Sequence, residues 1–324
     1  MKTLSIKKSA VINAVKAVSF LLVFAVLLSV TSRFFRPSDN TAKGGMNNPN
    51  AHGFYGESNK TIDVFVVGNS DAYSAFSPPE LWHHYGITSY VSGEGHQRPV
   101  ASVNMLREVL TCQKPRVAIL EVDGLFEGGD RLKETVQWAA YGAFPVFQYH
   151  DRWKHFSLDE VRKKPKYTGR FFAKGQFLSN DVVPYEGEEY MIPTVTTAWI
   201  PWSSRVYLNA FLDVCRENDI QPLLMEVPSQ TSWTYERHNA MVKYAEKHDV
   251  PFLDLDLARE EFDFDWTTDS RDGGNHLNNR GARKLTVYLG AYLQKTYALE
   301  DRRDDPAFDR WNKDYETYQK RTTI

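Results

Sequence analysis

The sequence predicts an α/β fold in which helices cover both faces of a central parallel sheet. Three observations support this prediction. Short apolar runs end in Gly, Asn or Ser, segments with helical periodicity follow them, and this alternation occurs in two cycles along the chain. Parallel strands need a crossover connection, usually a helix, so the alternation favours a parallel sheet.

The expected elements follow in chain order. The apolar run at 62–67 predicts a buried strand, and the Ser-Pro-Pro-Glu sequence at 77–80 is typical of a helix start. The other strands are expected at 89–91, 117–122, 222–227 and 251–254, and the other helices at 99–112, 203–218, 235–248 and 280–297.

The first 36 residues differ from the rest of the chain. Lys2, Lys7 and Lys8 precede an almost wholly apolar stretch at 10–32. About 20 helical residues cross the hydrocarbon core of a bilayer. We therefore expect a cytoplasmic stub and signal anchor at 1–36, a single pass through the cell membrane, and the remaining chain outside, because positive charge stays inside. A cleaved signal peptide is the alternative.

The rest of the chain divides by composition. Residues 37–60 are rich in Asn, Gly, Ser and Pro, which predicts a flexible spacer. We expect residues 61–297 to form one α/β domain, with an aromatic and basic insertion at 127–201. This insertion is interpreted as a surface excursion, a lid, a membrane-facing patch or a contact for an anionic polymer. Residues 298–324 are expected to form a charged C-terminal helix or tail.

Composition excludes several classes of protein. The formal net charge is −2 and the pI is about 6.5, which argues against nucleic acid as a partner. A mean hydropathy of −0.48 excludes a polytopic membrane protein, and two cysteines exclude a disulfide-dense scaffold. The sequence shows no metal-ligand spacing, phosphate loop or dinucleotide fingerprint, so we expect neither a metal nor a cofactor.

Polar residues follow the ends of three expected strands. Residues 68–71 read Gly-Asn-Ser-Asp, residues 92–97 read Ser-Gly-Glu-Gly-His-Gln, and residues 272–278 read Asp-Gly-Gly-Asn-His-Leu-Asn. In an open parallel sheet, ligands bind beyond the carboxyl ends of the strands. A serine becomes a nucleophile when a histidine takes its proton and a carboxylate orients that histidine. This inventory indicates nucleophilic acyl chemistry.

Each of these residues also has an interpretation without chemistry. Ser70 can be a turn or helix-capping serine, since serine commonly caps helices. His276 can be an ordinary loop histidine. Asp272 with Gly273 and Gly274 can be ordinary turn chemistry.

The order Gly-x-Ser near the start and Asp…His near the end resembles the SGNH/GDSL hydrolase superfamily. Residues 66–73, 81–86 and 272–282 are similar to membrane-anchored SGNH-like proteins of Firmicutes cell envelopes, some of which accompany acyltransferases. The resemblance covers most of residues 61–293. It implies a three-layer flavodoxin-like fold, with Ser70 as nucleophile, His276 as base and Asp272 orienting the histidine.

The sequence departs from this family in two places. The family spacing is Asp-x-x-His, whereas Asp272 stands four residues before His276, and Asp269 is a further candidate. The family oxyanion hole takes one donor from an Asn block, but the third strand is followed by Val-Asp-Gly at 122–124. An ionised carboxylate cannot donate a hydrogen bond.

Other residues are candidates for the oxyanion and substrate contacts. For the oxyanion hole, the resemblance points to a glycine of the second block, and neighbouring side chains are possible substitutes for the Asn: Gly93, Gly95, Asn69, Gln97 and Arg98. For the substrate, the candidates are Arg98, Arg152 and Trp153.

Two functions are expected to compete. The first is an extracytoplasmic serine esterase or O-acyltransferase that acts on an acyl ester of an envelope glycan or polymer, with a membrane-bound O-acyltransferase as a partner. The second is a catalytically weak or inactive SGNH-like module that binds envelope polysaccharide or acylated glycan, or scaffolds such an acyltransferase, which the missing Asn block favours. A small-molecule binder with a flavodoxin-like sheet is a weaker third alternative, because no phosphate loop is present.

Overall fold

A computed structural model of the chain describes residues 8–126, 131–155 and 164–322. The chain divides into two compact units. One comprises residues 1–47 and 136–166, and the other comprises residues 48–135 and 167–324. The insertion expected at 127–201 is therefore shared between the units. The second unit is called the sheet domain below.

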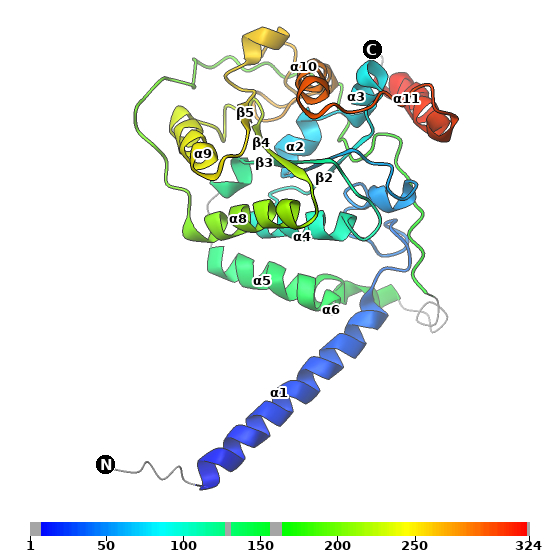
Figure 1. Cartoon of the computed structure of the whole chain (residues 1–324), viewed down its shortest axis with the longest axis vertical. Coiled ribbons are helices and arrows are strands. Elements are labelled where there is room, and N and C mark those ends of the chain that lie inside the picture. Colours follow the sequence, from blue (N-terminus) through cyan, green and yellow to red (C-terminus); the bar gives the residue numbers. More distant parts are fainter. Residues whose placement is uncertain (1–7, 127–130, 156–163, 323–324) are drawn as a thin grey trace. The chain divides into compact units, whose positions relative to one another are not determined.

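The sheet domain is built on a five-stranded parallel sheet with the order β2-β1-β3-β4-β5 (Figure 1). This is the flavodoxin-like order, so the α/β prediction and its parallel sheet are confirmed. The strands are β1 (Val64–Gly68), β2 (Ser89–Gly93), β3 (Val117–Glu121), β4 (Gln221–Glu226) and β5 (Phe252–Asp254).

Helices cover both faces of this sheet, which gives three layers (Figure 1). Alternating strand residues divide between two cores: Phe65 and Val67 face one, and Val64 and Val66 face the other. The first core is closed by α4 (Pro99–Val109), α8 (Trp202–Glu217) and α9 (Tyr235–His248), and the second by α2 (Ser70–Ala75), α3 (Pro78–Tyr85) and α10 (Asn279–Tyr297).

Most element boundaries agree with the sequence to within three residues. Three helices have no counterpart in the prediction: α5 (Arg131–Ala143) and α6 (Pro145–Gln148) lie in the expected insertion, and the six-residue α2 stands where the sequence predicts only a turn. It is too short to show a periodic pattern. The remaining short elements of the sheet domain are 3-10 helices: η1 (Gly53–Gly56), η2 (Asp123–Leu125), η4 (Arg259–Phe262) and η5 (Pro306–Phe308).

Part of the expected spacer packs into the sheet domain. Phe54 is fully buried and meets Phe65 and Tyr90 edge-on, with ring centroids 5.7 Å and 6.0 Å apart. The amide of Gln113 donates to the carbonyl of Phe54 at 3.3 Å. One aromatic ring thus fixes a polar segment, and residues 48–60 belong to the folded domain rather than to a spacer.

A buried ion-pair network joins three distant segments of the sheet domain. Lys174 is 1% exposed, and its ammonium donates to Glu57 at 2.8 Å and to Asp314. Arg170 pairs with the same two carboxylates at 3.0 Å and 2.8 Å. Removing one partner of such a network leaves an uncompensated buried charge, so the network specifies how these segments meet.

The C-terminal segment forms a helix, α11 (Asp309–Thr322). Trp311, Tyr315 and Tyr318 are all buried along one face of it. They join Trp82 of α3 in a small aromatic core. The helical spacing of these rings in the sequence corresponds to this buried stripe.

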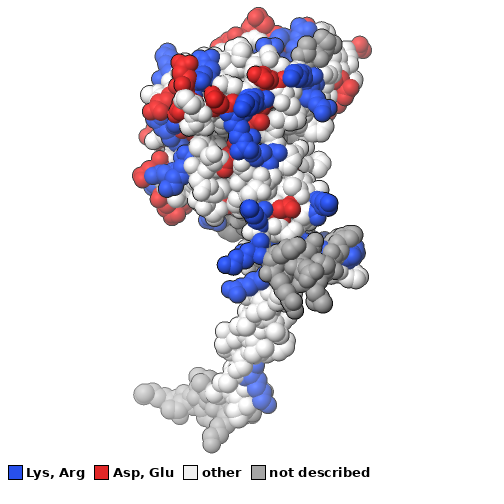
Figure 2. Space-filling view, turned by 90° about the vertical axis from the view of Figure 1, so that its right-hand side faces the viewer, with Lys and Arg blue, Asp and Glu red and all other residues white. Residues whose placement is uncertain are grey.

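The first unit contains α1 (Lys8–Phe35), α6 (Pro145–Gln148) and η3 (His150–His155), and it includes most of α5 (Arg131–Ala143). Residues Ala10–Phe35 are long and apolar enough to cross a membrane, with a hydropathy of 2.4 and none of the most apolar window buried. Figure 2 shows mostly uncharged atoms over this helix. Within the unit, Tyr149 lies 3.5 Å from the sulfur of Met46.

Candidate active site

Ser70 begins α2, directly beyond the carboxyl end of β1. The helix is capped by Asn69, whose side-chain oxygen accepts the N–H of Asp71 at 2.7 Å. The capping role therefore belongs to Asn69 rather than to Ser70 or Asp71. Burial raises the pKa of the Tyr73 phenol, one turn along the helix, while Arg271 and the Ser70 side chain oppose that rise.

The end of β3 holds the Ser70 turn in place. Glu121 accepts the backbone N–H of Asn69 at 3.1 Å, and Asp123 accepts the Asn69 side-chain amide at 2.9 Å. A side chain at Gly68 would come within 2.7 Å of Glu121, so the close approach of these strands requires glycine there. Arg237 of α9 pairs with Asp123 at 3.0 Å and balances its charge.

His276 lies on the loop that leads into α10, where it pairs with Asp272. The Oδ2 of Asp272 is 2.5 Å from Nδ1 of His276, and Oδ1 accepts the backbone N–H of His276 at 2.8 Å. Gly273 and Gly274 have φ of +85° and +103°, a conformation that favours glycine. The two glycines curl the loop so that a spacing of four residues still brings carboxylate and imidazole together.

The alternative carboxylate, Asp269, is engaged elsewhere. It is fully buried and pairs with Lys284 at 2.6 Å and with Arg280 at 3.1 Å. The structure thus gives the histidine Asp272 as its carboxylate, and it assigns Asp269 to holding α10.

The second ring nitrogen of His276 faces the Ser70 helix. Its Nε2 lies 3.9 Å from Oδ1 of Asp71, the residue that follows Ser70. Burial and the positive charge of Arg271 lower the pKa of His276, while the hydrogen bond to Asp272 raises it, and the net result is below the ordinary 6.5. The imidazole is therefore neutral at pH 7, as a general base must be.

Arg271 is a site residue that the sequence motifs do not indicate. Its guanidinium lies 4.4 Å from the ring centre of Phe177, and its charge acts on Asp71, Tyr73 and His276. Its Nη1 is buried and has no hydrogen-bond partner among the described residues. A buried donor without a partner is costly, so this N–H is a candidate for contact with a ligand.

The two glycine candidates border the Ser70 turn. Gly93 pairs with Gly68 across the sheet, and a Cβ added to it would lie 2.9 Å from the Gly68 carbonyl. A Cβ on Gly95 would lie 3.9 Å from the hydroxyl of Tyr73. Gly93 is thus placed where its backbone can approach a ligand at Ser70, whereas Gly95 lies beside the Tyr73 hydroxyl.

The side-chain candidates point to other partners. The amide of Asn69 donates to Asp123, and the buried amide of Gln97 donates to the hydroxyl of Ser102 at 2.9 Å. Arg98 is the residue before α4. These amides are occupied within the fold, so the structure offers neither of them to Ser70.

Arg152 and Trp153 belong to the first unit rather than to the sheet domain. Arg152 donates to the carbonyl of Phe35 at 3.2 Å, and Trp153 is exposed. Their role in substrate binding remains a prediction.

Two buried glutamates lie at the carboxyl ends of the central strands. Burial and the neighbouring carboxylates of Asp123 and Asp71 raise the pKa of Glu121 well above its ordinary value. Burial and the charge of Glu121 do the same for the pKa of Glu226, neither of whose carboxyl oxygens has a hydrogen-bond partner among the described residues. The position of the missing Asn block is thus filled by acidic groups.

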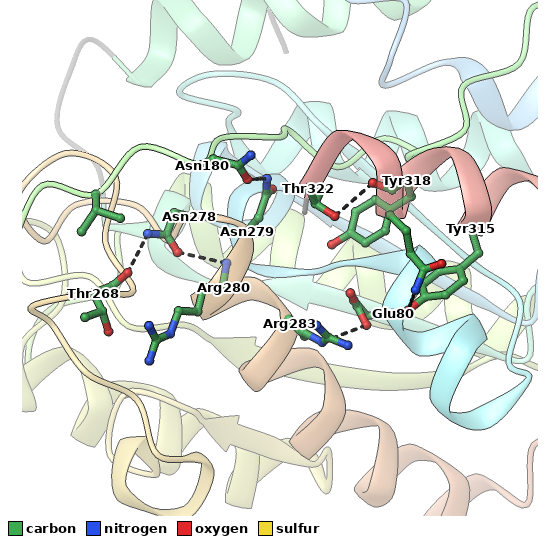
Figure 3. Close-up of a pocket in the computed structure, with 12 residues that line it drawn as sticks. Glu80, Asn180, Thr268, Asn278, Asn279, Arg280, Arg283, Tyr315, Tyr318 and Thr322 are labelled. Atoms are coloured by element: carbon green, nitrogen blue, oxygen red, sulfur yellow. Dashed lines mark hydrogen bonds and ion pairs between the residues drawn. The ribbon is translucent and has the colours of Figure 1, made fainter. Parts of the chain in front are cut away.

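A cavity of about 400 Å³ lies beside the His276 loop, between α10, α3 and α11 (Figure 3). Asn278, the cap of α10, reaches from this cavity to the carbonyl of Thr268, and Arg283 pairs with Glu80 across it (Figure 3). Ser70 and His276 do not line it. This cavity is therefore separate from the proposed chemistry.

The chain resembles several solved structures. One from Bacteroides fragilis, provisionally described as an acylhydrolase, shares 12% identity at a TM-score of 0.38, over 75% of this chain and 92% of that one. A second, from Desulfitobacterium hafniense, is provisionally described as a lipolytic protein of the G-D-S-L family; it shares 12% identity at a TM-score of 0.38, over 71% and 98%. A GDSL-like lipase from Bacteroides thetaiotaomicron shares 11% identity at a TM-score of 0.36, over 72% and 89%.

These structures include proteins described as GDSL-like, the superfamily that the sequence motifs resemble. At such identities and TM-scores the likeness carries no argument about activity, which rests on the geometry of the site. No family model matches the sequence, and no curated protein matches it significantly.

Proposed function

We propose that the chain is a membrane-anchored serine esterase or O-acyltransferase of the SGNH type, with its sheet domain outside the cell. The observation that carries the proposal is the His276 imidazole, whose Nδ1 meets Asp272 at 2.5 Å while its Nε2 faces the first turn of α2, where Ser70 begins the helix. A serine nucleophile is activated by a histidine that a carboxylate orients, and the His276–Asp272 pair beside the Ser70 helix supports that role.

The proposed reaction follows from these groups. Ser70 Oγ attacks the carbonyl carbon of an acyl ester while its proton passes to Nε2 of His276. The acyl–Ser70 ester forms and the leaving alkoxide takes the proton from the imidazole. Water or a sugar hydroxyl then attacks the acyl group, passes its own proton to His276, and Ser70 regains its proton. Asp272 stabilises the imidazolium that forms in each half.

Arg271 supplies the oxyanion donor that the end of β3 lacks. Its buried Nη1 has no partner among the described residues, and its charge acts on Tyr73, which lies one turn from Ser70 on α2. The backbone N–H groups of Ser70 and of Gly93 or Gly95 complete the set. Preorganised donors of this kind stabilise the charge that develops on the carbonyl oxygen.

The location and the substrate belong to the same proposal. Residues 10–35 are apolar enough to anchor the chain, and Lys2, Lys7 and Lys8 favour a cytoplasmic N-terminus. The acyl group would then belong to an envelope glycan or polymer, with a membrane-bound O-acyltransferase as partner.

The alternative is an inactive module that binds acylated glycan or scaffolds an acyltransferase. One observation favours it. The residues at the end of β3 are the acids Glu121 and Asp123, which accept hydrogen bonds from Asn69, and neither is a side-chain amide that could donate to an oxyanion.

Hydrolysis of p-nitrophenyl acetate by the full chain in detergent micelles separates the two functions. The enzyme requires turnover that Ser70→Ala abolishes and the exposed control Ser58→Ala retains. Turnover equal in wild type and Ser70→Ala contradicts the assignment.

A further inference from the structure

A groove of about 470 Å³ lies between the loop at 197–201 and helices α8 and α9, on the sheet domain. We call it the α8–α9 groove. Its lining residues come from these three segments: Thr197, Ala198, Trp199, Ile200, Trp202, Arg205, Val206, Asn209, Ala240, Lys243, Tyr244, Lys247 and His248. Ser70 and His276 do not line it, so it is distinct from the candidate active site.

Two tryptophans of this groove are exposed to an unusual degree. Trp199 and Trp202 are each 71% exposed, although large aromatic rings are normally buried in a globular domain. The guanidinium of Arg205 covers the ring of Trp199 at 4.6 Å from its centre. An exposed aromatic surface of this kind marks an interaction site.

The loop that carries Trp199 is fixed rather than loosely attached. The backbone N–H of Ala198 donates to the carbonyl of Glu236 at 2.8 Å, and Asn239 donates to the carbonyl of Thr196 at 2.7 Å. Lys243 donates to the hydroxyl of Thr197 at 2.6 Å. The groove is therefore preformed, which lowers the entropic cost of binding.

The charge of the groove has one sign. Arg205, Lys243 and Lys247 contribute cations, and none of the described residues that line the groove is acidic. The Nε of Arg205 is buried and has no hydrogen-bond partner among the described residues. The complement of this surface is a ligand that combines anionic groups with flat apolar faces.

We propose that the α8–α9 groove binds a segment of an anionic polysaccharide. Sugar rings present C–H faces that pack on the indoles of Trp199 and Trp202, and carboxylate or phosphate groups on the chain meet Lys243 and Lys247. The groove runs between a loop and two helices, which suits a chain-like ligand. This binding does not depend on the catalytic role of Ser70.

The test is affinity electrophoresis of the full chain in detergent micelles through gels that contain polygalacturonate or, in parallel, neutral dextran. We expect retardation by polygalacturonate alone. Trp199→Ala and Trp202→Ala should each weaken it about tenfold, and Lys243→Glu with Lys247→Glu should abolish it. The control Lys313→Glu, which makes the same charge change on the exposed face of α11, should retain it. Because both indoles are exposed, the thermal midpoints of the tryptophan variants should match wild type.

Three outcomes overturn the proposal. The first is equal retardation by dextran and polygalacturonate. The second is retardation that Lys313→Glu weakens as much as Lys243→Glu does, which indicates nonspecific charge. The third is no retardation together with quenching of the Trp199 indole by brominated phosphatidylcholine after the full chain is reconstituted into vesicles, which assigns the groove to a bilayer. Retardation that persists in Ser70→Ala supports the proposal whether or not the enzyme assignment holds.

Discussion

The two halves of the candidate active site differ in how they are built. In the acid–base half, Asp272 pairs with His276, and the second ring nitrogen of His276 faces the helix that Ser70 begins. In the oxyanion half, the end of β3 carries buried acids, and a buried N–H of Arg271 on the His276 loop has no hydrogen-bond partner among the described residues. Under the proposed function, the base is therefore held by its own loop, whereas charge stabilisation depends on an arginine in place of an amide after β3.

The largest effect is expected in the acid–base half. His276→Ala removes the group that takes the Ser70 proton, so kcat for ester hydrolysis should fall by roughly 10⁴–10⁶. Steady-state hydrolysis of p-nitrophenyl acetate measures this loss. His84→Ala, which removes an exposed histidine of α3, should leave kcat near wild type. A loss equal to that of His84→Ala would remove His276 from the mechanism.

Asp272→Asn should cost about 10⁴ in kcat, because the amide no longer holds the imidazole in the required tautomer. The exposed Asp263 provides a matched control, since its φ of +52° suits asparagine as well as aspartate. Asp263→Asn should therefore keep both activity and stability. Activity of Asp272→Asn within a few-fold of wild type would show that the histidine is oriented by another group.

In the oxyanion half, Arg271→Gln should lower kcat/KM by about 10²–10³, the usual cost of losing one oxyanion donor. It should also move the acidic limb of the pH profile. Arg271 lowers the pKa of His276, so its removal raises that pKa and shifts the limb to higher pH. The exposed Arg216→Gln is the control. A rise in KM without a change in kcat or pH profile would make Arg271 a substrate-binding residue only.

The smallest effect concerns the buried acids. Burial and the charge of Glu121 raise the pKa of Glu226 in the folded protein. The protonated Glu226 carboxyl therefore stabilises the fold fully below its ordinary pKa of 4.5, and this stabilisation is lost as the pH rises towards the pKa of the folded state. Glu226→Gln has no proton to lose, so its melting temperature relative to that of wild type should rise by roughly 2–5 °C between about pH 5 and about pH 8. Glu246→Gln on α9 controls for removing one carboxylate. A difference independent of pH would contradict the neutral state of Glu226.

Much of the sheet domain could be predicted from its sequence because its signals are local. The strands are continuous apolar runs bounded by turns, and the long helices have a periodic face. The six-residue α2 has no periodicity to read, and Phe54 is one aromatic residue in a polar segment. Their places depend on what packs against them, such as Phe65 and Tyr90.

The site divides in the same way. The sequence could indicate Ser70, Asp272 and His276 as candidates because their order along the chain is informative. The two glycines after Asp272 are the signal that a spacing of four residues still lets its carboxylate reach His276. Arg271 could not be found, because its importance comes from a buried N–H that lacks a hydrogen-bond partner in the part of the chain that the structure describes, and that burial exists only after Phe177 and the loop have packed around it.

Reaction of the full chain with a fluorophosphonate, followed by peptide mass mapping, tests whether Ser70 is a nucleophile activated by His276. We expect one phosphonyl group to attach to Ser70 and His276→Ala to suppress the labelling. Labelling at another serine, or labelling at Ser70 that is unchanged in His276→Ala, would contradict this assignment.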